Sequence, residues 1–185
     1  MYIEQVKEIL GDRFSRDADF LSTFVTELKL PKDSKVLDVG TGRGTMAIIL
    51  ALHGYKVTTG EPKGTYWADW RSSAKKVNVE NLIEFKPLNA ENLPFKDAFF
   101  DAVFLYTTLH HIKNKQRAFS ELLRVINVKG ALIIIELTEH GVEMIRQTYP
   151  GHPDAVDPRD YIKNLDLEIQ VIESRYLNSY VFKKR

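Results

Sequence analysis

The chain has 185 residues, of which 44% are hydrophobic, so it is long enough for one domain with a substantial core. Lysine and arginine number 26 against 25 aspartates and glutamates, a net charge of +1, which excludes a strongly basic protein of the kind that binds nucleic acid or anionic membranes through its overall charge. Cysteine is absent, which excludes disulfides, thiolate metal sites and a cysteine nucleophile.

Apolar runs in this sequence are too short to cross a bilayer. The longest cover residues 46–52 and 131–135, whereas a spanning helix needs about 20 apolar residues. The first residues also lack the basic start and apolar stretch of a signal peptide. We therefore expect a cytoplasmic protein with no membrane partner, while its oligomeric state stays open.

Two helices are expected at the start of the chain. Apolar residues at helical spacing predict a helix over residues 3–10, which Gly11 can end with a left-handed conformation. The same spacing over residues 20–28 predicts a second helix, with Asp17 or Asp19 as its N-cap. We expect residues 1–30 to lie over the active site.

After these helices the pattern alternates between strands and helices, which is typical of a right-handed, mostly parallel sheet. The last two strands are so close in sequence that they predict an antiparallel hairpin. We therefore predict a single domain over residues 1–185 of the α/β class, with a Rossmann-like, mostly parallel seven-stranded sheet, helices on both faces and a C-terminal antiparallel hairpin. Strands are expected at 35–39, 55–59, 82–88, 100–106, 131–137, 168–174 and 177–182, and helices at 45–53, 66–77, 114–126 and after Asp157.

The strongest motif is the glycine-rich segment 36–44, which joins a strand to a helix. Glycines at such a turn let a ligand approach the backbone, and the following helix offers free N–H groups. A dinucleotide-binding turn needs its third glycine three positions after the second, but that position is Thr45, and Gly44 comes one residue early. Because the acidic Asp38 also precedes the turn, the pattern favours an adenosyl amino acid over a pyrophosphate.

This segment resembles the class I S-adenosylmethionine-dependent methyltransferases, especially the small branch of ubiquinone-biosynthesis-like (type 11) enzymes. The resemblance covers residues 30–140 and implies S-adenosyl-L-methionine as the cofactor. It further implies that the carbonyl of Gly40 and the carboxylate of Asp38 face the amino group of the cofactor's methionine part. Thr41 and Gly42, within the same turn, are further expected cofactor contacts.

Two later segments complete the expected cofactor site. Glu61 ends the second expected strand, where a carboxylate can accept hydrogen bonds from two ribose hydroxyls. The resemblance implies that Pro62 packs against the adenine. Asn89 and Ala90 stand where the family has Asp-Ala, so the resemblance implies that they bind the adenine edge, the amide oxygen of Asn89 replacing the usual carboxylate.

Candidate catalytic residues are Tyr106, His110 and His140. Residues 100–112 resemble the fourth strand of this branch and its exit, including the paired His110 and His111, and the resemblance implies that Tyr106 lies beside the sulfonium. We expect the two histidines to anchor the loop by hydrogen bonds, with a general base as the alternative. Adjacent residues rarely point the same way, and no glutamate or further histidine has a useful spacing, so no metal site is expected.

The connection over residues 138–157 is unusually long for a compact domain, and such connections often act as lids. It contains His140, Tyr149 and His152 and follows the fifth expected strand, on the side where ligands bind in such sheets. A plain connection with a short helix over residues 142–149 is the alternative. We expect the connection over residues 138–157 to form the substrate pocket together with the N-terminal helices.

The predicted activity is methyl transfer from S-adenosylmethionine by in-line displacement to an unidentified small molecule, with protein or RNA acceptors not excluded. Two alternatives stay open: a nicotinamide-dependent oxidoreductase on a similar fold, and a non-catalytic S-adenosylmethionine-binding partner that activates another subunit. A base-methylating enzyme is disfavoured, because the Asn/Asp-Pro-Pro-aromatic signature of amino-group methylators is missing at residues 105–108.

Overall fold

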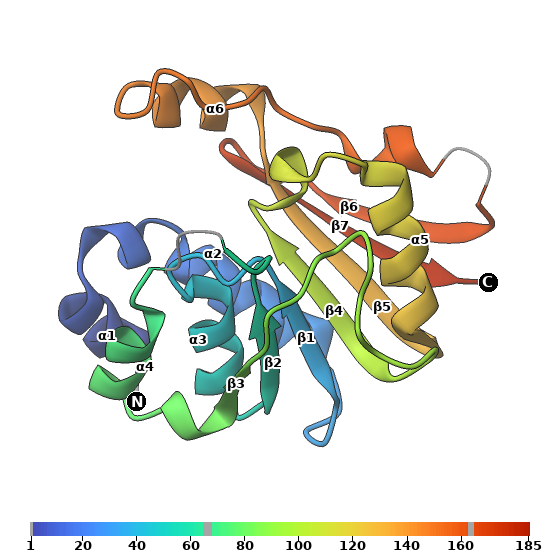
Figure 1. The fold of residues 1–185 in the computed structure, drawn as a ribbon. Coiled ribbons are helices and arrows are strands. Elements are labelled where there is room, and N and C mark those ends of the chain that lie inside the picture. Colours follow the sequence, from blue (N-terminus) through green and yellow to red (C-terminus); the bar gives the residue numbers. More distant parts are fainter. Residues whose placement is uncertain (1, 65–67, 163–164) are drawn as a thin grey trace. The chain divides into compact units, whose positions relative to one another are not determined.

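The computed structural model describes residues 2–64, 68–162 and 165–185. It confirms the predicted fold class: seven strands follow the order β3-β2-β1-β4-β5-β7-β6, with helices packed beside them (Figure 1). The strands are β1 (Val36–Val39), β2 (Val57–Gly60), β3 (Ile83–Phe85), β4 (Phe100–Tyr106), β5 (Ile126–Leu137), β6 (Leu167–Ile172) and β7 (Leu177–Lys184).

The helices alternate with the parallel strands as expected. The α-helices are α1 (Ile3–Leu10), α2 (Asp12–Leu28), α3 (Thr45–Leu52), α4 (Trp70–Lys76), α5 (Lys115–Val125) and α6 (Glu139–Arg146). Short 3₁₀ turns are η1 (Glu80–Leu82), η2 (Leu109–His111) and η3 (Pro158–Tyr161).

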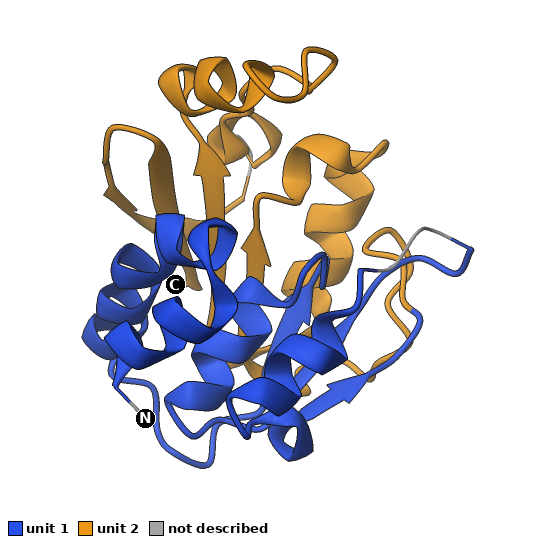
Figure 2. Cartoon of the chain, turned by 90° about the vertical axis from the view of Figure 1, so that its left-hand side faces the viewer, with its two compact units in different colours: residues 1–87 blue, residues 88–185 orange. Residues whose placement is uncertain are grey.

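The chain forms two compact units, residues 1–87 and 88–185 (Figure 2). Unit 1 contains α1 to α4 and the parallel strands β1, β2 and β3, with Val57 of β2 paired to Val36 and to Ile83. All four residues of β1 are buried, and α3 is buried on nearly every side, which agrees with its almost uniformly apolar sequence. These buried elements hold the glycine-rich segment in place at its two ends.

The N-terminal part of unit 1 differs from the prediction in one respect. Helix α2 begins at Asp12, directly after Gly11, rather than beside an N-cap at Asp17 or Asp19. Asp17 lies within the helix and is buried, and its carboxylate binds the guanidinium of Arg16 (Nη2–Oδ2 2.6 Å). The prediction was wrong because an aspartate suits an N-cap only where the chain before it is not already helical.

Unit 2 contains the parallel pair β4–β5 and the antiparallel strands β7 and β6. In β5, Ile133 pairs with Phe104 on one side and with Val181 on the other. The C-terminal strands β6 and β7 pair antiparallel, which confirms the predicted hairpin. Strands β4, β5, β7 and β6 form a mixed layer, and α5 and α6 pack against its strand β5.

Strand β5 is longer than predicted. It starts at Ile126, immediately after α5, and not at Ala131 after a turn. The pairing of β5 with β4 shifts register between Ile126 and Ala131. The four residues between them, which were expected to form a turn, are instead an irregular part of the strand. A Cβ at Gly130 would lie 2.7 Å from the carbonyl oxygen of Asp101, which explains the glycine there.

Three other helix starts are set by caps. Helix α4 begins after Asp69, whose side chain accepts a hydrogen bond from Ser72 N (3.1 Å); the predicted start at residues 66–67 lies outside the described residues. Helix α6 begins after the capping Thr138, so it covers an earlier stretch than the predicted 142–149. Asp157 caps a helical start as predicted, but the element is a single 3₁₀ turn.

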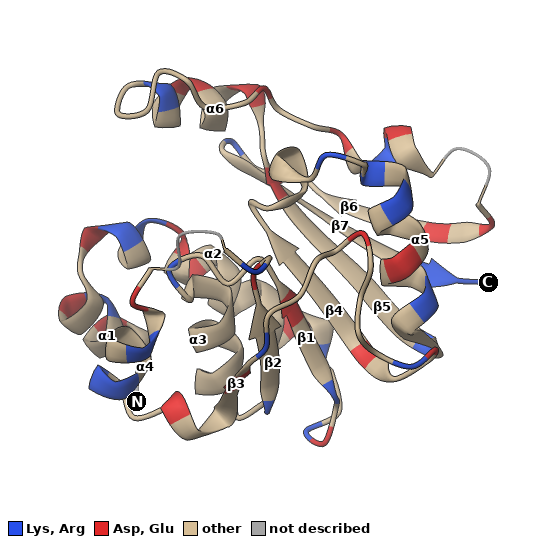
Figure 3. Cartoon of the chain, in the orientation of Figure 1, with Lys and Arg blue, Asp and Glu red and all other residues tan. Residues whose placement is uncertain are grey.

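Charges of both signs are distributed over the elements of each unit (Figure 3), in agreement with the net charge of +1. Of the helices in the described ranges, none combines the length and the apolar character that crossing a membrane requires.

Candidate active site

The glycine turn after β1 depends on backbone conformations that glycine adopts most easily. Gly40, Gly42 and Gly44 have φ angles of 91°, 50° and 81°. The backbone amides of Gly40 and Thr41 donate to the carbonyl of Gly60 at the end of β2 (3.0 and 3.3 Å). The turn is therefore fixed to the neighbouring strand, with little side-chain bulk of its own.

Asp38 lies within β1 as a fully buried carboxyl group. Thr59 of β2 donates a hydrogen bond to its Oδ2 (2.8 Å), and Thr41 Oγ1 lies 2.8 Å from Thr59 Oγ1. Its other oxygen, Oδ1, has no hydrogen-bond partner within the described part of the chain. Burial raises the pKa of Asp38 to about 7; the hydrogen bond from Thr59 opposes this effect, and the charge of Glu61 adds to it.

Glu61 follows β2 and lies against the glycine turn. The backbone amide of Gly42 donates to its Oε1 at 2.6 Å. The adjacent Pro62 is exposed. The structure thus brings Asp38, Glu61 and the turn together, because β1 and β2 are parallel neighbours that end at the same edge.

This group of residues suits a ligand that carries both a cation and hydroxyl groups. A buried carboxyl with one unpaired oxygen is costly, and a cationic hydrogen-bond donor would satisfy it. A half-exposed carboxylate can accept hydrogen bonds from two neighbouring hydroxyls. Within the glycine turn, the nearest atom to a Cβ added at Gly42 would be 4.0 Å away, so a ligand can approach the backbone there, whereas the space beside Gly44 is filled by Trp70.

The other predicted cofactor residues, Asn89, Ala90 and Tyr106, belong to unit 2. Asn89 is exposed, and its Oδ1 accepts a hydrogen bond from Glu91 N (2.9 Å), while Ala90 is buried. A carbonyl oxygen has two lone pairs, so Asn89 keeps one for a ligand.

Two charged residues of α5 hold the loop that follows Asn89. Glu121 Oε2 accepts from Leu93 N (2.8 Å), and Arg124 donates to the carbonyls of Leu93 (3.0 Å) and Phe95 (2.8 Å). The hydrogen bond from Arg124 lowers the pKa of Glu121. These two residues position the loop, a role that the sequence did not suggest.

The exit from β4 contains a strained residue. Thr107 has a φ of 46°, which is a genuine outlier for a β-branched side chain, and its amide donates to Ile135 O (2.8 Å). Tyr106 precedes it at the end of the strand and is half-buried. Strain of this kind tends to occur at functional sites.

His110 is held by a buried glutamate. Its Nδ1 lies 2.6 Å from Glu136 Oε2, and Glu136 Oε1 accepts from Leu109 N (2.6 Å). The side chains of His110 and Glu136 are each only 2% exposed. Glu136 has no motif-like spacing from His110 in the sequence, but β5 runs parallel to β4 and places Glu136 beside η2.

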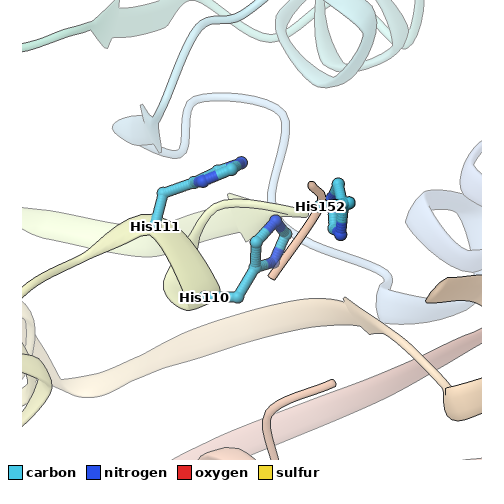
Figure 4. Close-up of side chains that lie close together, drawn as sticks. All are labelled: His110, His111 and His152. Atoms are coloured by element: carbon cyan, nitrogen blue, oxygen red, sulfur yellow. The ribbon is translucent and has the colours of Figure 1, made fainter. Parts of the chain in front are cut away.

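A third histidine completes this group. The ring of His110 lies 4.1 Å from that of His111 and 4.8 Å from that of His152, measured between centroids (Figure 4). The adjacent histidines were expected to point apart, but in a 3₁₀ turn successive side chains do not alternate between opposite faces. Partial desolvation, followed by the charges of His110 and His152, lowers the pKa of His111 to about 4.

His140 and Tyr149 lie outside this group. His140 is exposed on α6, and Tyr149 is 50% exposed beyond it. The sequence did carry a signal for Glu136, which it did not identify as functional: Glu136 is the one charged residue in the apolar run over residues 131–137. His152 gave no such signal, because only the connection after α6 brings it to His110.

Comparison with known proteins identifies the family of the chain. A family model described as a methyltransferase domain matches residues 37–134, more than half of the 185 residues. A demethylmenaquinone methyltransferase from Clavibacter sepedonicus is 30% identical over 129 residues, which cover 67% of this chain and 49% of the relative. A ubiquinone/menaquinone biosynthesis C-methyltransferase UbiE from Xylella fastidiosa (strain M12) is 29% identical over 144 residues, covering 74% and 55%.

The chain spans about half the length of these curated relatives. Among solved structures, a SAM dependent methyltransferase from Aquifex aeolicus is similar in fold, with a TM-score of 0.68 at 19% identity and 98% of both chains covered. The family model, the relatives and the fold all indicate a methyltransferase domain. The chain therefore belongs to the methyltransferase domain family, and its resemblance to the class I S-adenosylmethionine-dependent methyltransferases is confirmed.

Proposed function

We propose that this chain is an enzyme that uses S-adenosyl-L-methionine to methylate a small molecule. Family membership supports the reaction type, and unit 1 supports the cofactor. The observation that carries the proposal is Asp38 Oδ1, a fully buried carboxyl oxygen without a partner in the described ranges, next to the glycine turn. A cationic amino group is the ligand that would satisfy it.

The residues of unit 1 fit this cofactor. Asp38 would accept from the amino group, directly or through water, and Glu61 would accept from the ribose hydroxyls. When bound, the cofactor would supply an activated methyl group for transfer to the acceptor by in-line displacement, with S-adenosylhomocysteine as the leaving group. The chain itself has to hold and orient the reactants and exclude water, which requires no catalytic triad.

The acceptor is proposed by class only. The names of the two relatives refer to quinone biosynthesis, which supports a small molecule as the acceptor. Catalytic roles for Tyr106, His110 and His140, and a lid over residues 138–157, stay predictions.

Calorimetry with S-adenosylmethionine and S-adenosylhomocysteine tests the proposal. We expect both to bind, and Glu61→Gln to weaken binding roughly 10- to 100-fold, because hydrogen bonds to a charged group contribute about 1.5–3 kcal/mol. Glu84→Gln, an exposed glutamate on β3 in the same unit, is the matched control and should bind like the wild type. Absence of binding to either compound, or binding of a nicotinamide cofactor instead, would contradict the proposal.

Turnover is then measured with labelled S-adenosylmethionine and a panel of small-molecule acceptors that includes quinols, other hydroxyl compounds and carbon acids. We expect at least one of them to accept the label. Binding without turnover on any acceptor, together with capture of a partner subunit, would instead support the non-catalytic alternative.

A further inference from the structure

Unit 2 contains a compact group of three imidazoles, which we call the histidine cluster: His110, His111 and His152. Their potential ligand atoms all lie within 4.8 Å of one another. Two come from η2 and the third from the connection after α6, so the fold, and not a sequence motif, brings them together (Figure 4).

The tautomer of His110 is set by Glu136. The carboxylate accepts from His110 Nδ1 (2.6 Å), so this nitrogen carries the proton and Nε2 presents a lone pair. His110 Nε2 is buried and has no hydrogen-bond partner among the described residues. A buried polar atom is rarely left unpaired, so we expect this nitrogen to bind a ligand.

His152 is oriented in the same manner. Its Nδ1 lies 2.9 Å from the carbonyl oxygen of Pro153, to which it donates, and its Nε2 is thereby also left as an acceptor. The backbone around it is fixed by Arg146, which donates to His152 O through Nε (2.9 Å) and Nη2 (2.7 Å) and pairs with Asp154 (2.7 Å).

The contacts of His110 and His152 are of the kind that orient metal-binding histidines in other proteins. A ligating histidine almost always donates its other ring N–H to a carboxylate or a backbone carbonyl, which fixes the tautomer and aims the free nitrogen at the metal. Glu136 does this for His110, and the carbonyl of Pro153 does it for His152. We propose that the histidine cluster binds a divalent metal ion of the zinc type.

The donor set narrows the choice of metal. Three imidazoles suit Zn²⁺ and other late transition metals, whereas Mg²⁺ and Ca²⁺ require oxygen ligands. Three protein ligands also leave the fourth tetrahedral position open for a water or for an oxygen of another ligand, as in catalytic zinc sites.

The geometry needs one adjustment. Zinc–nitrogen bonds of 2.0–2.1 Å separate the nitrogens of a tetrahedral site by about 3.3 Å, which is less than the 4.8 Å span of the cluster. His110 is fixed, but His111 is exposed, so its ring is free to turn toward the other two. Binding of the ion therefore requires a rotation of His111, the most exposed of the three ligands.

Zinc affinity is measured on the full chain by competition with a chromophoric chelator, without S-adenosylmethionine. We expect one zinc ion per chain. His111→Ala and His152→Ala each remove a proposed zinc ligand. Each should lower the zinc affinity by more than the roughly 10- to 100-fold expected when only a residue that hydrogen-bonds a ligand is lost. His140→Ala, an exposed histidine on α6 outside the cluster, is the matched control and should keep the wild-type affinity.

Two further measurements separate a built site from loose surface binding. Glu136→Gln should weaken zinc roughly 10- to 100-fold while the circular dichroism of the chain stays native. Co²⁺ should show the visible absorption of a tetrahedral complex in the wild type and lose it in His152→Ala. Zinc affinity that is equal in wild type and His152→Ala, or that falls as much in His140→Ala, would overturn the proposal, whatever the outcome for S-adenosylmethionine.

Discussion

Asp38 has no exposed surface, and only one of its two oxygens is bonded in the described structure. Removal from water is the main reason why its pKa rises from 3.8 to about 7. In the free protein this carboxyl therefore takes up a proton near neutral pH. A cationic ligand favours the carboxylate and returns the pKa toward its ordinary value.

This gives a pH-dependent prediction for cofactor binding. Below pH 7, the amino group of S-adenosylmethionine has to displace a proton from Asp38, so we expect its affinity to fall by up to about tenfold per pH unit. Calorimetry at pH values on either side of 7 measures this slope.

Asp38→Asn should remove the slope and weaken binding above pH 7, because an amide has no charge to offer. The exposed Asp33→Asn in the same unit is the control and should keep the wild-type slope. A flat wild-type profile would mean that Asp38 does not meet the amino group.

His110 shows a second way in which one residue depends on another. Its imidazole is aimed by Glu136, a carboxylate that would be costly inside an apolar strand without its two hydrogen-bond donors. The buried glutamate is thus explained by the ring that it orients.

At the scale of elements, α6 packs closely against the connection between β6 and β7. A Cβ at Gly141 would clash with the carbonyl oxygen of Tyr176, a backbone atom that cannot move aside like a flexible side chain. The amide of Thr138, the N-cap of α6, donates to the same carbonyl (3.0 Å). The glycine therefore allows α6, and with it Arg146, to lie where it does.

Gly141→Ala should lower the free energy of unfolding. Alanine favours a helix by about 1 kcal/mol over glycine, but overpacking costs about 1–3 kcal/mol, and here the clash is with backbone. We expect a net loss of about 1 kcal/mol, measured by urea unfolding.

The control for this prediction is Gly151→Ala. No atom lies within 4 Å of a Cβ at that position, so its stability should be unchanged or slightly higher. A Gly141→Ala variant as stable as Gly151→Ala would show that α6 does not depend on this close approach.

At the scale of the whole molecule, the residues of the candidate sites are divided between the two units, and the predicted cofactor residues Asn89, Ala90 and Tyr106 lie in the same unit as the histidine cluster. Asp38, Glu61 and the glycine turn belong to unit 1, whereas the histidine cluster belongs to unit 2. The ligands expected at the two sites differ in chemistry, so S-adenosylhomocysteine tests the first site and zinc tests the second.

S-adenosylhomocysteine should stabilise the native chain. A ligand at 100 times its dissociation constant adds about 2.7 kcal/mol to the free energy of unfolding when it does not bind the unfolded state. Thermal unfolding at several ligand concentrations measures this gain, and Glu61→Gln should need more ligand for the same shift. A transition temperature that does not change with ligand concentration would contradict binding to the folded chain.

The sequence by itself determined the fold class and the methyltransferase family of this protein. The features that carried these predictions are local: hydrophobic periodicity, the spacing of glycines 40, 42 and 44, and the position of Glu61. Local features can be read directly from the order of residues in the chain. Element ends were less well determined, as at Asp12 and Ile126, because caps and register depend on neighbours in space.

Only the tertiary structure decided the surroundings of the histidines. Glu136 lies 26 residues from His110, and His152 lies further along the chain, after α6. Their meeting depends on the parallel pairing of β4 with β5 and on the course of the following connection. No spacing rule expresses such long-range packing, so the contact between these side chains could be found only in three dimensions.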